Sequence, residues 1–355
     1  MEGDAAIIGA GQAGCAAAIR LAQAGARVVL FRGQSTSANR PGEVVSSSAK
    51  VTLSELGLLG SFEALGFPAL AGTLSVWDEP LPNEREGIVD PYGLAAIIDR
   101  HRFEDWLIAS AQDRGVLLQD GGRELDVKPE RGGWRIQAKR SATSIRCPVV
   151  IEATGRSAGL LGEGRRVGTD KLVAFLQYGV RPEHMADQRM LIEASAHGWW
   201  YAAPLPENKA VIAFLTDADL PTKGAASRRA FVEGELATTS LLREFAERLA
   251  SRDDTYGHPA NSSIRACING AAWVAIGDAA ATYDPLSGQG IATTLAKGAA
   301  IARLIAGGDC LSKSLESYAD AERQCFSSYL NVQRATYSRA APRFNSPFWS
   351  RRAGL

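Results

Sequence analysis

Apolar and polar residues alternate in blocks that predict a strand, a helix and a second strand within the first 32 residues. Residues 5–8 form a short apolar run, residues 11–24 are rich in Ala, Ile and Leu, and residues 27–31 form a β-prone run. Gly9, Gly11 and Gly14 stand between the first strand and the helix. This order predicts a βαβ unit whose helix N-terminus offers backbone N–H groups to an anionic ligand.

A second segment, almost 270 residues later, repeats the order of strand, glycine turn and helix. The apolar residues 272–276 lead into Gly277 and Asp278, and residues 284–291 precede a helix that is predicted to end near residue 306. Both segments present backbone N–H groups at a helix start. We expect them to form the two ends of one FAD site.

The remaining pattern predicts a second layer and a helical tail. Apolar and polar residues alternate from 173 to 216, which is typical of an antiparallel sheet. Helices are predicted at 103–113, 225–251 and 312–339, and Pro342 and Pro347 end the last one. The predicted fold class is α/β: a Rossmann-like FAD-binding βαβ domain, a mostly antiparallel substrate-domain sheet and a C-terminal helical tail. The predicted domains are FAD-binding (1–75, 99–160 and 262–308), substrate-binding (76–98 and 161–261) and tail (309–355).

Composition narrows the possible partners. Lys and Arg total 39, as do Asp and Glu, so no overall field favours nucleic acid or an anionic membrane. The five cysteines are scattered without a Cys-x-x-Cys pair, which predicts neither a disulfide framework nor a metal site. No apolar run reaches the ~20 residues that span a bilayer, and the early start of the first strand leads us to expect no signal peptide. We therefore expect a cytoplasmic enzyme.

Several motifs together resemble a known family. They are the glycine turn, residues 41–43 (Pro-Gly-Glu), 99–107, 153–156, 277–278 and 284–291. With these the chain resembles single-component FAD-dependent proteins of the para-hydroxybenzoate hydroxylase fold, in the branch that holds flavin-dependent halogenases and geranylgeranyl reductases. Residues 198–206 and 348–352 look most like the flavoproteins that mature protein-derived tryptophylquinone cofactors.

The resemblance implies roles for individual residues in FAD binding. Gly9 allows the tight turn, Gly11 the approach of the pyrophosphate, and Gly14 the packing of the helix on the strand. Asp278 is expected to bind a ribityl hydroxyl and Pro285 to fix the loop beneath the flavin. The remaining residues expected at the cofactor are Ala13, Glu43, Arg102, Gly277, Gly288, Gln289, Gly290 and Ile291.

Arg32 departs from the dinucleotide-binding pattern. It stands where an acidic side chain would bind the ribose hydroxyls. An arginine there favours either the 2′-phosphate of NADP or a solvated surface role, with the ribose held by another group. The second glycine segment favours FAD, so Arg32 is counted among the FAD-site residues.

Candidate catalytic residues are His197, Trp200 and Glu43. His197 precedes Trp199, Trp200 and Tyr201, an aromatic cluster that is expected to line an aromatic substrate pocket. Alternation along a strand allows only two of these three aromatic residues to share one face.

The expected reaction is FAD-dependent hydroxylation of an aromatic, indole-like or tryptophan-like substrate. The substrate is a free small molecule or a residue of a partner polypeptide during quinone cofactor maturation, and the reductant is NAD(P)H or a separate flavin reductase. Three alternatives remain: a flavin reductase or dehydrogenase, a flavoprotein that acts mainly by binding its partner, and a halogenase. The halogenase is least favoured, because no lysine lies between Val51 and Asp99 and the Trp-x-Trp-x-Ile-Pro motif of halogenases is absent.

Overall fold

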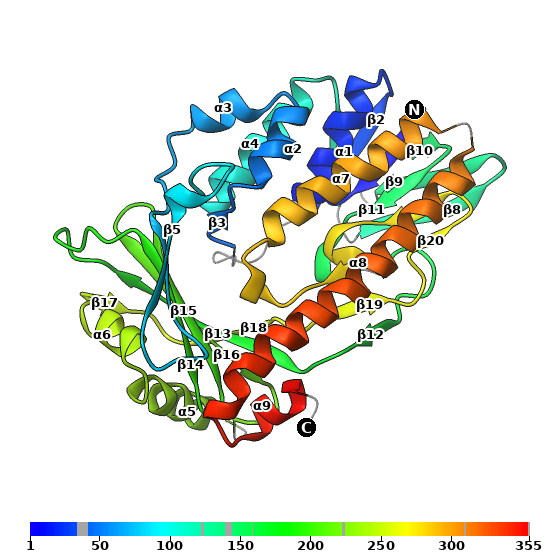
Figure 1. Ribbon diagram of the computed structural model, residues 1–355. Helices are drawn as coiled ribbons and strands as arrows, with labels where there is room; N and C mark the ends of the chain where they lie inside the picture. The colour runs from blue at the N-terminus through cyan, green and yellow to red at the C-terminus, as the bar shows by residue number, and fades with distance from the viewer. Residues whose placement is uncertain are drawn as a thin grey trace.

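The structure is a computed structural model that describes residues 1–33, 42–121, 124–138, 144–157, 159–221, 224–308 and 310–353. Pro41, the first residue of the predicted Pro-Gly-Glu turn, lies outside the described residues. A parallel sheet with its helices forms one part of the molecule, and a large antiparallel sheet forms the other (Figure 1).

The parallel sheet confirms the predicted FAD-binding fold. Its strand order is β20-β21-β11-β1-β2-β7, and all neighbours are parallel except β20 and β21. Each residue of β1 is buried, which explains why the first apolar run has no polar position. The strands are β1 (Ala5–Ile8), β2 (Val28–Arg32), β7 (Leu117–Asp120), β11 (Val150–Glu152), β20 (Asn269–Gly270) and β21 (Trp273–Ala275).

The first helix lies unusually close to a helix from the far end of the chain. A methyl group at Gly298 of α7 would lie 2.2 Å from the Ala13 carbonyl oxygen of α1, so only glycine permits this approach. Small side chains thus bring the two glycine segments together. The helices around this sheet are α1 (Gln12–Gln23), α2 (Ala49–Glu55), α3 (Leu59–Glu63), α4 (Arg100–Gln112) and α7 (Gly290–Gly307).

The second sheet follows the order β17-β13-β16-β15-β14-β4-β5, with β18 also paired to β13. Its pairs are antiparallel except β14 with β4, in agreement with the predicted alternation. β4 begins at Gly72, four residues before the predicted domain boundary at 76. The strands are β4 (Gly72–Val76), β5 (Asn83–Glu86), β13 (Leu172–Val180), β14 (Arg189–Ser195), β15 (Gly198–Leu205), β16 (Lys209–Asp217), β17 (Ser251–Arg252) and β18 (Tyr256–Pro259).

Different helices cover the two faces of this sheet. α5 (Ala225–Ala237) and α6 (Leu241–Glu247) pack on one face through Val232, Leu236 and Phe245. The long C-terminal helix α8 (Leu311–Ala340) runs from the parallel sheet to the other face, where its end and α9 (Pro347–Ala353) contribute Tyr337 and Trp349 (Figure 1). The tail therefore joins the two parts.

Short strands complete the fold. β8, β9 and β10 form a small antiparallel sheet, β12, β19 and β22 another, and β3 pairs with β6. Among the described residues, no helix has the length and apolar character to cross a membrane, and no three His, Cys, Asp or Glu side chains form a candidate metal cluster. The bounds are β3 (Val44–Val45), β6 (Ala96–Ile97), β8 (Leu125–Glu130), β9 (Gly133–Ala138), β10 (Ser144–Cys147), β12 (Arg166–Gly168), β19 (Ser263–Arg265) and β22 (Ala281–Thr282).

Candidate active site

The N-terminal glycine turn has the geometry of a dinucleotide cradle. Gly9 has φ +114°, and a methyl group there would lie 2.1 Å from the Ala153 carbonyl oxygen. At Gly14 a methyl group would lie 1.9 Å from the Gly9 carbonyl oxygen, so the helix packs directly on its own turn. At Gly11, by contrast, a methyl group would meet no atom within 4 Å. That open space is where a pyrophosphate can approach the start of α1.

The second glycine segment lies against the first. Gly277 has φ +56°, and a methyl group there would lie 3.0 Å from the Ala13 side chain. The neighbouring Asp278 carboxylate is half exposed and lies 3.8 Å from the Arg156 guanidinium. Asp278 therefore points into accessible space beside the cradle, where a hydroxyl-bearing ligand can reach it.

The loop from Pro285 to Ile291 closes the other end of the site. Gly288 (φ +62°) and Gly290 both have open space where a side chain would stand. No side chain caps the N-terminus of α7, which leaves its first backbone N–H groups available to an anionic ligand. The Gln289 side-chain oxygen accepts hydrogen bonds from the Ser46 and Ser48 hydroxyls at 2.9 and 2.7 Å.

Glu43 lies at the junction of the two sheets. It is buried, and its two carboxylate oxygens lie 3.5 Å from the hydroxyls of Tyr178 and Tyr201, which come from β13 and β15. A methyl group on the preceding Gly42 would lie 3.9 Å from Ile291 of α7. Glu43 thus connects the start of α7 with the antiparallel sheet.

Burial controls the electrostatics of this cluster. Desolvation raises the pKa of Glu43, and backbone N–H groups of the turn together with Arg100 and Tyr178 oppose that rise. Desolvation, followed by the nearby Glu43 charge, also raises the pKa values of Tyr178 and Tyr201. The Tyr178 ring stacks on Tyr256 with centroids 5.9 Å apart. The result is a buried carboxyl surrounded by phenols, which can hold or pass a proton.

The expectation that Trp200 and His197 share this site needs correction. Trp200 is buried on the opposite sheet face, where it stacks on Phe214 at 4.5 Å. His197 lies in the β14–β15 turn, and its Nδ1 is 2.6 Å from the Glu235 carboxylate of α5. Successive strand residues point to opposite faces, so Tyr201 reaches Glu43 while Trp200 points away.

The residue expected beside the flavin on α4 also differs. Arg102 is exposed, donates to the Leu65 carbonyl at 2.8 Å and lies over the Phe67 ring. Arg100 instead bonds the Glu104 carboxylate at 2.8 Å and reaches the Gly42 carbonyl at 3.5 Å. Residues two apart on a helix lie on nearly opposite sides, so Arg100 replaces Arg102 at the turn before Glu43.

Arg32 ends β2, as expected, and has a protein partner. Its guanidinium forms an ion pair with Asp120 of β7 at 3.1 Å, and both side chains are largely exposed. Such a pair is typical of a surface arginine. Its part in cofactor binding stays a prediction.

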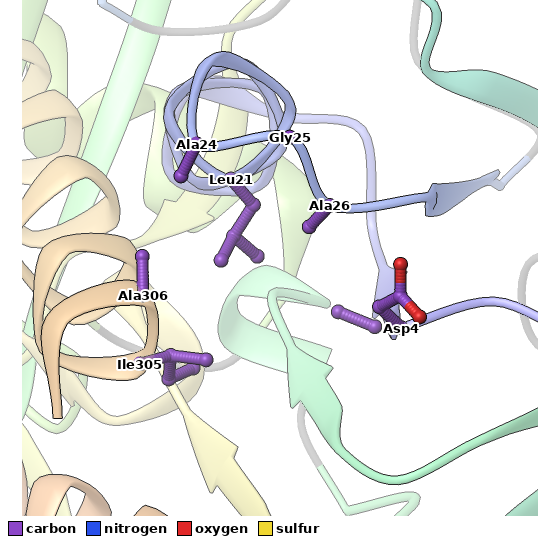
Figure 2. Close-up of a pocket in the computed structure, with 8 residues that line it drawn as sticks. Asp4, Leu21, Ala24, Gly25, Ala26, Ile305 and Ala306 are labelled. Atoms are coloured by element: carbon purple, nitrogen blue, oxygen red, sulfur yellow. The ribbon is translucent and has the colours of Figure 1, made fainter. Parts of the chain in front are cut away.

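Two hollows lie outside the glycine cradle, one distant from it and one beside it. One, of about 290 Å³, lies between the amino end of β1 and the ends of α1 and α7; Leu21, Ile305 and Ala306 point into it (Figure 2). Its Asp4 carboxylate is held by Arg27, so it offers little chemistry. The other, of about 540 Å³, is lined by His258 and Asn261 among others, and the Asn261 carbonyl accepts a hydrogen bond from Arg156. This hollow therefore adjoins the Asp278 end of the cradle.

Comparison with known proteins agrees with this geometry. A family model described as FAD binding domain matches residues 2–328. The FAD-dependent oxidoreductase LodB of Marinomonas mediterranea is 26% identical to this chain over an alignment of 363 residues. The alignment covers 98% of this chain and 96% of LodB.

Two solved structures share the fold over nearly the whole chain. The peptidyl tryptophan dihydroxylase QhpG superposes with a TM-score of 0.79 at 25% identity, covering 99% of this chain and 79% of QhpG. The myxobacterial chondrochloren halogenase CndH superposes with a TM-score of 0.84 at 22% identity, covering 99% of this chain and 86% of CndH. The open glycine positions, the uncapped starts of α1 and α7 and the accessible Asp278 all fit FAD. The chain belongs to the FAD binding domain family and is a FAD-dependent oxidoreductase.

Proposed function

We propose that this enzyme is a monooxygenase that hydroxylates an aromatic, indole-like ring, and that the ring is a tryptophan of a partner polypeptide. The observation that carries the proposal is the buried Glu43 carboxyl between Tyr178 and Tyr201, next to Gly42, where an added methyl group would lie 3.9 Å from Ile291 at the start of α7. QhpG, which acts on peptidyl tryptophan, and LodB support the choice of substrate class.

FAD, when bound and reduced, supplies the electrons and the oxygen-transfer chemistry. The protein holds the ring and manages protons. The phenol rings of Tyr178 and Tyr201 offer an aromatic wall for a flat substrate. Replacing a ring C–H by C–OH releases the ring proton, and Glu43 is the carboxyl within the tyrosine cluster that can receive it. Burial of Glu43 between the two sheets excludes water from this step.

The test is oxygen labelling with two substrates. The enzyme is incubated with ¹⁸O₂, NAD(P)H or a flavin reductase, and either free tryptophan or a tryptophan-containing peptide. The proposal predicts one ¹⁸O atom per hydroxylation, with the peptide preferred. Oxidation without label, or turnover that continues without O₂, would instead indicate a dehydrogenase or reductase.

A pair of glycine variants tests whether FAD binds at the glycine cradle. Gly11→Val places a side chain in the open space at the start of α1, and we expect it to lose FAD absorbance. Gly60→Val, at an open position of α3 where the backbone has no positive φ, serves as a control for a glycine outside the cradle. Full flavin absorbance in Gly11→Val would refute the placement of the pyrophosphate.

Halogenation is the second candidate, because of Lys50. This lysine precedes the lysine-free interval from Val51 and lies on α2, two residues after Ser48, which bonds Gln289. Its ammonium also lies close to Gly93. A wild-type product that contains chlorine or bromine, together with loss of this product in Lys50→Met, would establish a halogenase. Hydroxylation without halide by both the wild type and Lys50→Met would rule halogenation out.

A further inference from the structure

An exposed apolar segment borders the β5 edge of the antiparallel sheet. Leu81, Ile88, Val89 and Tyr92 are each between 52% and 76% exposed. They are four of the eleven exposed large apolar side chains among the described residues, yet they fall within a short stretch of chain. Such a concentration is typical of a binding surface.

The same stretch contains the last strand of the sheet. β5 ends the described strand order, and its four residues, Asn83–Glu86, are all exposed. Its free edge therefore presents backbone N–H and C=O groups to a further strand. We call residues 79–92 the β5 edge surface.

The β5 edge surface is acidic in a chain with a formal net charge of zero. Residues 79–92 contain four carboxylates and one arginine. Glu84 is bound by Arg189 at 2.7 Å, and Asp90 lies 3.9 Å from Arg85. Glu79 and Glu86 form no ion pair with any described residue. They are free to attract a cationic partner.

The surface is continuous with the site. The carboxylate of Asp90 has a lowered pKa because it accepts hydrogen bonds from the Tyr92 backbone and the Ser47 hydroxyl. Ser47 lies between the two serines that hold Gln289. A few residues later β6 pairs with β3, the strand that follows Glu43. The Asp90 end of the β5 edge surface therefore contacts the segment that follows Glu43.

We propose that the β5 edge surface docks an extended segment of the partner polypeptide, in which lysine or arginine alternates with apolar residues beside the tryptophan to be oxidised. Backbone pairing to β5 supplies orientation, Ile88 and Val89 supply apolar contact, and Glu79 and Glu86 select the cationic side chains. This proposal rests on the proposed function for the identity of the oxidised residue. A membrane is the other candidate occupant, but free carboxylates repel anionic lipid.

Binding, measured without turnover, tests the proposal. The probe is a short fluorescent peptide in which lysine and valine alternate around one tryptophan, and its twin carries glutamate for lysine. The FAD-loaded enzyme should bind the lysine peptide about tenfold more tightly than the twin, and salt should reduce the difference. Ile88→Ser with Val89→Ser should weaken binding about tenfold. Val332→Ser, at a similarly exposed valine on α8, should change nothing.

Charge reversal decides the selectivity. Glu79→Lys with Glu86→Lys should remove or invert the preference between the peptides. Absence of peptide binding, equal binding of both peptides, or indifference to these variants would overturn the proposal. Flotation with phosphatidylcholine–phosphatidylglycerol vesicles that depends on Ile88 and Val89 would assign the surface to a membrane instead. Because no product is measured, failure of the ¹⁸O₂ experiment leaves these outcomes interpretable.

Discussion

The two faces of the antiparallel sheet are both rich in aromatic residues, but only one of them meets the FAD-binding part. On that face Tyr201 and Tyr178 approach Glu43, and Trp199 donates to Tyr337 of α8 at 2.8 Å. On the other face Trp200 and Phe214 stack beneath α5 and α6. Adjacent residues of one strand, Trp200 and Tyr201, therefore belong to different environments.

The difference shows that aromatic content alone does not mark a substrate site. The Trp200 face is closed by apolar side chains of α5 and α6. The Tyr201 face carries a buried carboxyl and phenols whose pKa values burial raises. We expect the reaction to take place on the Tyr201 face, where a polar group is buried beside the cofactor cradle. We expect the apolar Trp200 face to contribute mainly to the stability of the fold.

The largest expected effect is on stability, from Trp200→Ala. Removing this fully buried ring from its stack on Phe214 should lower the free energy of unfolding by about 3–5 kcal/mol. Product formed per folded, FAD-loaded molecule should remain unchanged. Urea unfolding measures the loss of stability, and the ratio of product to O₂ consumed measures the reaction. Release of peroxide in place of product would show that Trp200 belongs to the active site.

Glu43→Gln should act on activity and on the pH dependence of stability. Loss of the proton acceptor should reduce product formation about a hundredfold. Because burial raises the pKa of Glu43 in the folded protein, its contribution stabilises the fold at low pH and is lost as the pH rises through the folded pKa. The Glu43→Gln variant has no ionisable group at this position, so its stability does not fall in this way as the pH rises.

Thermal unfolding of both proteins across mildly acidic to neutral pH measures this effect. The stability of Glu43→Gln relative to wild type should increase as the pH rises. A relative stability that falls with pH would show that the carboxylate is stabilised in its charged form. At more acidic pH, below the ordinary Asp pKa of 3.8, Asp78→Asn should show the opposite sign, because it removes a partly exposed carboxylate whose pKa is lowered by Arg339.

The smallest effect is expected from His197→Gln. The His197 side chain is 40% exposed and contacts Glu235 on the far side of the sheet from Glu43. We expect a stability change of about 1 kcal/mol and no change in the ratio of product to O₂ consumed. A large loss of product at unchanged stability would contradict the separation of the two faces.

The sequence predicts the geometry of the glycine turn well, because each glycine there is required by the local backbone conformation or packing. The positive φ of Gly9 and the open space at Gly11 follow from one turn between a strand and a helix. The place of Arg102 at the flavin stays a prediction, and the arginine that faces the Glu43 turn could not be chosen from the sequence, since the pattern locates a helix more reliably than the side that faces a neighbour. Arg100, rather than Arg102, reaches Gly42.

The tyrosine cluster was only partly predictable. Tyr201 lies in the aromatic run that the sequence singles out, but Tyr178 and Tyr256 come from β13 and β18, which meet only through sheet register. Their approach to Glu43 depends on how the two sheets pack. No local pattern in the sequence shows how the two sheets pack. The alternating pattern around Tyr178 could have shown only which face of β13 this side chain occupies.

The most direct test compares Tyr201→Phe with Trp200→Phe for product formed per O₂ consumed, using the tryptophan peptide and ¹⁸O₂. Both changes keep an aromatic ring, and they alter neighbouring residues on opposite faces. Loss of the Tyr201 hydroxyl near Glu43 should lower the ratio about tenfold, a value that matches one ordinary hydrogen bond, while Trp200→Phe should leave it unchanged. A normal ratio in Tyr201→Phe together with a reduced ratio in Trp200→Phe would contradict the assignment of the reaction to the Glu43 face.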